Sequence, residues 1–114
     1  MSPPRLKTGL WVQATLRRLD GAGFPCALLR RGDSEAGTVL IRLDRRQAGT
    51  IVLSLARDPE GRLHWLAATG EDPVDGEAAD AYVERQVRRD PDIWVIEIDD
   101  PKGAARATLD TPSG

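Results

Sequence analysis

The sequence predicts an α+β fold, and three observations support this. Four short runs of aliphatic and β-branched residues lie between Pro25 and Ala68, separated by stops rich in Gly, Asp and Pro. Two segments with helical spacing flank these runs, and a last apolar run, Ile93 to Ile98, follows the second of them. We therefore expect the order helix, four-strand antiparallel meander, helix, final strand, with both helices packed on one face of a single sheet.

The first expected helix runs from Leu10 to Ala22. Most of its apolar positions share one helical arc, although part of the set also alternates as in a strand. The Arg- and Leu-rich second half and the following stop favour a helix. Thr8 is expected to cap its start, and Gly21 or Gly23 is expected to supply the left-handed residue that closes it.

Turns separate the four strands of the expected meander. Asp58-Pro59-Glu60-Gly61 has the residues of a type I turn between the last two strands. The first strand is apolar at consecutive positions, which predicts that neither of its faces is wet. The expected strands are Cys26 to Arg31, Thr38 to Leu43, Thr50 to Ala56 and Arg62 to Ala68.

The second expected helix runs from Glu77 to Asp90, with apolar residues at helical spacing and Asp75 placed to accept its first free amides. Pro91 ends it. The run from Ile93 to Ile98 is apolar toward both faces apart from Glu97, so we expect it to lie inside the sheet.

The length of 114 residues predicts one domain, over residues 5–100, with flexible tails at 1–4 and 101–114. Cys26 is the single cysteine and cannot form an internal disulfide, so we expect a buried, reduced thiol and a cytoplasmic location. The sequence shows neither a secretory signal nor a membrane span, and no membrane association is expected.

Charge is distributed unevenly along the chain. Residues 1–57 hold ten Lys or Arg against four Asp or Glu, a net +6, and residues 58–114 hold six against fourteen, a net −8. Such asymmetry marks either a basic contact surface or two halves that complement each other within the fold. We favour the second interpretation.

No motif in the sequence predicts catalysis, a cofactor or a metal site. His64 is the only histidine, no second cysteine is present, and no glycine-rich nucleotide motif follows a strand. No catalytic residue, cofactor or metal ligand is therefore assigned, and a non-enzymatic role is favoured.

Five residues form the candidate binding set: Arg31, Asp33, Glu35, Trp65 and Arg85. The loop from Gly32 to Gly37 would present its two carboxylates beside Arg31 to a ligand. The simpler interpretation is a polar turn in which Asp33 bonds to its own backbone. Tryptophan is enriched among binding hot spots, although most tryptophans line a core.

The leading prediction is a protein-interaction or regulatory module that forms a homodimer or binds an unknown protein partner, because a small domain with apolar strands gains core by pairing. The alternative is an enzyme or small-ligand binder that uses Asp33 and Glu35. The third hypothesis is nucleic-acid binding through an arginine face. The acidic total and the scarcity of aromatic residues among these arginines count against it. Its arginines are Arg17, Arg18, Arg30, Arg31, Arg42, Arg45 and Arg46.

Several short segments together form a recognisable pattern: Leu10-Trp11-Val12, Leu16-Arg17-Arg18, Arg30-Arg31-Gly32-Asp33, Glu35-Ala36-Gly37, Ala81-Tyr82-Val83-Glu84-Arg85-Gln86, Asp90-Pro91-Asp92, Trp94 and Glu97-Ile98. With these segments the chain resembles a family of short bacterial proteins, mainly alphaproteobacterial, known as domain of unknown function 1491. The similarity covers Arg5 to about Asp100. It implies a stand-alone intracellular domain and brings no known activity, cofactor or catalytic residue.

Overall fold

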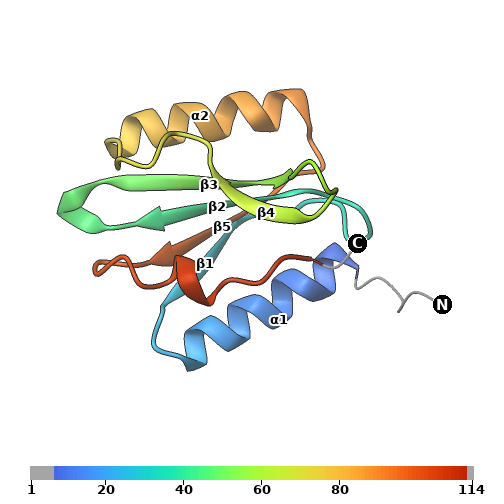
Figure 1. Cartoon of the computed structure of the whole chain (residues 1–114), viewed down its shortest axis with the longest axis horizontal. Coiled ribbons are helices and arrows are strands. Elements are labelled where there is room, and N and C mark those ends of the chain that lie inside the picture. Colours follow the sequence, from blue (N-terminus) through green and yellow to red (C-terminus); the bar gives the residue numbers. More distant parts are fainter. Residues whose placement is uncertain (1–6, 113–114) are drawn as a thin grey trace.

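A computed structural model describes residues 7–112 and shows a five-stranded mixed sheet with one helix on each face (Figure 1). The expected order of helices and strands is confirmed. The expected tail at residues 1–4 lies outside the described residues. The elements are α1 (Thr8–Gly21), β1 (Cys26–Arg30), β2 (Val39–Asp44), β3 (Thr50–Arg57), β4 (Leu63–Ala67), α2 (Gly76–Arg89) and β5 (Trp94–Asp99), with short 3-10 turns η1 (Arg46–Ala48) and η2 (Arg106–Thr108).

The strand order is β1-β5-β2-β3-β4, so the first four strands do not form a meander. The strand β5 separates β1 from β2; it runs antiparallel to β1 and parallel to β2. Only β2, β3 and β4 form the expected antiparallel hairpins. The long loop at residues 31–38 gives β1 the freedom to sit one strand away from β2. The expected interior position of the last strand is confirmed.

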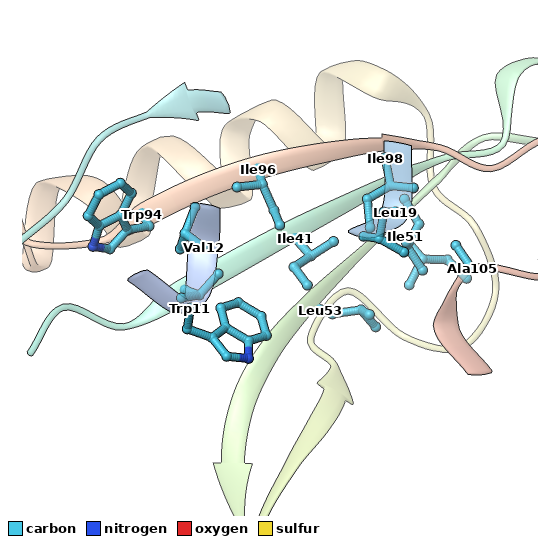
Figure 2. Packing of buried hydrophobic residues seen from close by; sticks show 12 residues of the cluster. Trp11, Val12, Leu19, Ile41, Ile51, Leu53, Trp94, Ile96, Ile98 and Ala105 are labelled. Atoms are coloured by element: carbon cyan, nitrogen blue, oxygen red, sulfur yellow. The ribbon is translucent and has the colours of Figure 1, made fainter. Parts of the chain in front are cut away.

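The helices lie on opposite faces of the sheet, so the expectation that both pack on one face is wrong (Figure 1). Neighbouring residues Leu40 and Ile41 of β2 are both buried, and they belong to core clusters on different faces. Successive side chains of a strand point to opposite faces, so a strand apolar at every position needs cover on both. Figure 2 shows Trp11 and Val12 of α1 beside Ile96 of β5 in the larger cluster.

The start of α1 differs from the expected cap, and its end agrees with it. Lys7 is the N-cap, and Thr8 is buried in the first turn without a capping hydrogen bond. At the other end, Gly23 adopts a positive φ of 91°, and the amide of Phe24 donates to the carbonyl of Leu19 at 2.9 Å. Glycine tolerates this left-handed conformation without a Cβ clash, which lets the chain leave the helix toward β1.

Two other local signals are confirmed. The carboxylate of Asp75 accepts the amide of Ala78 at 2.7 Å and caps α2. Between β3 and β4, the amide of Gly61 donates to the carbonyl of Asp58 at 2.8 Å, as a type I turn requires.

The segment after β5 packs along the α1 face of the sheet (Figure 1). The sequence predicts a tail from residue 101 with little to bury, yet Ala105 is fully buried in the core and Pro112 is also buried. The indole Nε1 of Trp65 donates to the carbonyl of Asp110 at 2.9 Å. This segment therefore covers a part of the α1 face of the sheet that α1 itself does not reach. Residues 113–114 lie outside the described residues.

Candidate interaction site

The loop that was expected to present carboxylates is folded on itself. The Oδ2 atom of Asp33 accepts the amide of Ala36 at 2.9 Å, and its carbonyl accepts the indole Nε1 of Trp94 at 2.7 Å. This agrees with the turn interpretation. Gly32 and Gly37 lie directly against the chain before β5, and a Cβ on either would collide with the carbonyl oxygen of Asp92. The two glycines are needed for this close approach.

The structure gathers only part of the candidate binding set. The guanidinium of Arg31 lies over the ring of Trp94, 5.6 Å from its centre, close to Asp33. Glu35 pairs with Lys7 at 3.4 Å.

The other two candidates lie elsewhere. Trp65 is on β4, with its ring centre 5.9 Å from that of Trp11 on the α1 face. Arg85 is on α2, 6.0 Å from the ring centre of Tyr82, on the opposite side of the sheet. The five residues therefore do not form one site.

The basic first half and the acidic second half of the chain are joined by ion pairs. Of the seven ion pairs among residues 7–112, five join a basic residue of the first half to an acidic residue of the second, as the complementary-halves interpretation predicts. These pairs hold four of the seven arginines of the hypothetical nucleic-acid face, which therefore do not gather as one free surface. The five pairs are Arg18–Asp110, Arg42–Asp80, Arg42–Glu97, Arg45–Asp100 and Arg46–Asp99.

The most exposed apolar element at a sheet edge is β1. Leu28 and Leu29 expose 42% and 50% of their surface, and Ala27 between Cys26 and Leu28 is also exposed. The expectation that this strand is buried on both faces is wrong, because its place at the edge leaves it one neighbour, β5. Exposed edge strands carry unpaired backbone groups and favour pairing with another chain.

The backbone pairing shows which groups of β1 face outward. The amide of Asp99 donates to the carbonyl of Pro25 at 2.9 Å, which makes residues 25 and 99 a hydrogen-bonded pair. Such pairs alternate along an antiparallel ladder, so Ala27 pairs with β5, and the N–H and C=O groups of Cys26 and Leu28 point away from it. Leu28 thus presents at the edge one donor and one acceptor that have no partner in β5.

A bulge at Leu29 ends this regular stretch, since Leu28 lies opposite Ile96 and Arg30 lies opposite Val95. Directly opposed residues share a face, so Leu28 lies on the α1 face with Ile96. Leu29 instead lines a shallow groove of about 170 Å³ between α2 and the sheet. The edge therefore shows apolar side chains on both faces.

The groove beside β1 has a charged floor. Arg42 of β2 is largely covered there and pairs with Glu97 and, at 3.1 Å, with Asp80 of α2. The apolar part of the groove comes from Leu29 of β1, Val95 of β5, and Val83 and Val87 of α2. Arg42 thus links α2 to the central strands β2 and β5. Leu29 of β1 lies at the margin of the groove and stays half exposed.

The opposite edge, β4, is partly covered by the segment that follows β5. The guanidinium of Arg106 donates to the carbonyl of Trp65 at 3.3 Å, and its other nitrogen holds Glu71 at 2.8 Å. With the bond from Trp65 to Asp110, these contacts cover part of β4, although Leu66 exposes 48% of its surface. Among the described residues, β1 receives no such cover on its outer edge.

A second hollow, of about 400 Å³, lies where β2 and β5 end. Arg46 and Asp99 form a two-bond pair at its rim, and the hydrogen bond from Arg46 holds the pKa of the Asp99 carboxyl below its usual range. The buried Asp100 accepts the amides of Ala104 and Ala105 at 2.8 and 3.1 Å. These charged groups are thus engaged in closing the turns around the hollow.

Cys26 begins β1 as a half-buried thiol that donates to the carbonyl of Phe24 at 3.1 Å. Burial, and then the charge of Asp20, raises the pKa of this thiol. A raised pKa keeps it protonated, which does not suit a nucleophile.

Two general features complete the description of residues 7–112. No helix in this part of the chain is long and apolar enough to cross a membrane. Nor do three His, Cys, Asp or Glu side chains come together here as a set able to hold a metal ion.

Sequence reasoning missed the exposed edge because it expected both faces of β1 to be covered. One signal was present: Arg30 and Arg31 follow the apolar run directly, and charged residues are common on edge strands.

Comparisons with known proteins agree with this fold. A family model for proteins of unknown function, DUF1491, matches residues 6–108. A crystal structure of a DUF1491 family protein from Caulobacter crescentus is 38% identical, covers 94% of this chain and 97% of its own, and has a TM-score of 0.80. A solution structure of a protein from A. tumefaciens is 30% identical, covers 97% and 100% of the two chains, and has a TM-score of 0.71. Among curated proteins, none matches the chain.

Proposed function

The chain belongs to the DUF1491 family of proteins of unknown function, and from that premise we propose that it is a non-enzymatic interaction module that self-associates through the outer edge of β1. One observation carries the proposal: an apolar strand at the margin of the sheet, with Leu28 and Leu29 about half exposed and the backbone of Leu28 directed away from β5 with no partner among residues 7–112. Strand addition at such an edge is a common mode of protein recognition.

The size of the edge sets the strength of the association. Burying the exposed half of one leucine contributes about 1 kcal/mol, so four leucines across a dimer contribute about 4 kcal/mol. Hydrogen bonds between the strands add to this, and the loss of rotational and translational freedom opposes it. We therefore expect a weak and reversible dimer that forms only as the protein concentration rises, as is typical of small interfaces.

The test is the molar mass measured by light scattering after size-exclusion chromatography, over a series of protein concentrations. The wild-type chain should change from monomer to dimer as concentration rises. Leu28→Lys should remain a monomer, because a charge would have to be buried at the interface. Leu66→Lys is the matched control, since Leu66 is similarly exposed on the other edge strand, and it should dimerise as wild type does.

Two results would refute the proposal. One is a wild-type chain that stays monomeric at every concentration. The other is equal dimerisation of the Leu28→Lys and wild-type chains, with circular dichroism showing that both are folded.

The alternative functions receive less support. Asp33 bonds within its own loop and Glu35 pairs with Lys7, so neither carboxylate of the small-ligand hypothesis is held ready for a ligand. The arginine face has lost Arg42 and Arg46 to carboxylates, which weakens the nucleic-acid hypothesis.

A further inference from the structure

We propose that the second copy adds to β1 in one register, antiparallel and centred on Leu28, so that the two sheets join edge to edge. The inference rests on the proposed function and goes beyond it, because it fixes which residues of the two copies meet. It also predicts that the dimer is two-fold symmetric, with the same surface used by both copies.

The backbone of β1 favours this centre. Leu28 points both its N–H and its C=O outward, so a two-fold axis there allows each Leu28 to donate to and accept from the other. Leu28 is also the middle residue of β1, so this centre sets Cys26 and Ala27 of each strand against the bulged end, Leu29 and Arg30, of the other. A centre on Cys26, which also points outward, would place Leu28 opposite Phe24, outside the strand.

The charges at the two ends of β1 fit the same register. Antiparallel pairing brings Arg30 of one copy opposite Cys26 of the other, with Arg31 one position further. Asp20 lies close enough to Cys26 for its charge to act on the thiol, and within residues 7–112 it makes no ion pair. The side chain of Arg30 lies on the α2 face and donates to the carbonyl of Pro91. The cation that this register brings toward Asp20 is therefore Arg31, whose guanidinium lies over Trp94 on the α1 face. Symmetry repeats this contact at the other end of the paired strands.

The side chains also match. In this register, Leu29 of one copy lies opposite Ala27 of the other, where the small alanine leaves room for it. Both lie on the α2 face, beside the groove lined by Val83 and Val87. On the α1 face, the two Leu28 side chains meet each other. Leucines that are half exposed in one copy become covered on both faces of the joined sheet.

The ends of β1 keep the paired stretch short, and the use of one shared edge limits the association to two copies. Pro25 has no N–H to donate, and the bulge at Leu29 interrupts regular pairing beyond Leu28. Because both copies use the same edge, the association closes on itself and does not continue into a fibre.

The decisive experiment is disulfide formation by Leu28→Cys in a Cys26→Ser background. Residues of a hydrogen-bonded antiparallel pair have Cα atoms about 5.5 Å apart, within the range that a disulfide spans. Mild oxidation should convert most of this variant to a covalent dimer on non-reducing gels. Leu66→Cys in the same background is the control, and it should form no covalent dimer on the same gels. The wild-type chain should not crosslink, because its Cys26 faces Arg30.

A charge exchange tests the same register without cysteine chemistry. Asp20→Arg and Arg31→Asp should each weaken dimerisation by roughly tenfold, since each change places like charges together twice in the dimer. The double variant should recover wild-type affinity.

The outcomes separate the register from the function. A wild-type dimer in which Leu28→Cys fails to crosslink and the double variant does not recover would overturn the register and leave the interaction module standing. Ready crosslinking of wild-type Cys26 would overturn it as well. A wild-type chain that never dimerises would overturn both.

Discussion

Single residues fix the places where distant segments touch. Gly32 and Gly37 let the loop after β1 pass directly against Asp92, and the carbonyl of Asp33 then receives the indole N–H of the buried Trp94. The sequence shows these two glycines and the acidic residues between them, but not their target. The partner lies about sixty residues away, and local turn chemistry says nothing of it.

Gly37→Ala should therefore destabilise the fold. Its Cβ would collide with the carbonyl oxygen of Asp92 and lie 3.0 Å from backbone atoms of Asp33, so backbone has to move. We expect a loss of about 2 kcal/mol or more in the free energy of unfolding, measured by urea denaturation. Gly21→Ala is the control: nothing lies within 4 Å of its added Cβ, and this helical site should gain about 0.5 kcal/mol. Equal stabilities of the two variants would contradict this account of the loop.

The thiol of Cys26 gives a pH-dependent prediction. Burial, followed by the charge of Asp20, raises its pKa in the folded chain above the unfolded value. The protonated thiol therefore favours folding below the unfolded pKa, and this contribution disappears as pH rises through the folded pKa. Alkylation of the native chain should be slow at neutral pH and accelerate only above the ordinary thiol range. Rapid alkylation near pH 7 would show that the environment of the thiol is different.

Local sequence signals predict where helices, strands and turns occur, but they do not predict which strands pair with each other. The turn at Asp58 and the cap at Asp75 could be predicted because the residues that define each feature lie within four positions of one another. The pairing of β2 with β5 joins Val39 to Trp94, and local patterning does not specify such a distant partner. The apolar residues on both faces of β5 predicted correctly that it lies inside the sheet, but they did not identify the strands beside it.

The largest error at this scale was the prediction that both helices pack on the same face of the sheet. Both faces of β2 and β5 are apolar, which already requires cover on two sides. The free edge at β1 was missed for a related reason: an apolar run indicates either an interior strand or an edge that another chain covers.

The cap of α2 provides a test of an element that sequence does predict. Asp75→Ala removes the hydrogen bond to the amide of Ala78, and we expect a loss of about 1 kcal/mol in unfolding free energy. Asp72→Ala, a nearby exposed carboxylate with no hydrogen bond among the described residues, should change stability by less than about 0.5 kcal/mol. Thermal melts of the two variants measure the difference, and similar melting temperatures would argue against the cap.

At the scale of the molecule, the two edges of the sheet are treated differently. The segment after β5 crosses the α1 face and partly covers β4 through Arg106 and Asp110. In contrast, β1 carries exposed leucines, and its outward backbone groups have no partner in the part of the chain that the structure describes. This difference between the two edges is the reason why we propose that another chain joins the sheet at β1.

Amide hydrogen exchange at low and high protein concentration tests this claim most directly. We predict that the amide of Leu28 exchanges more slowly as concentration rises, because it gains a hydrogen-bond acceptor in the second copy, while the amides of β4 keep their rates. An unchanged rate at Leu28, in a sample whose mass has doubled, would contradict the account.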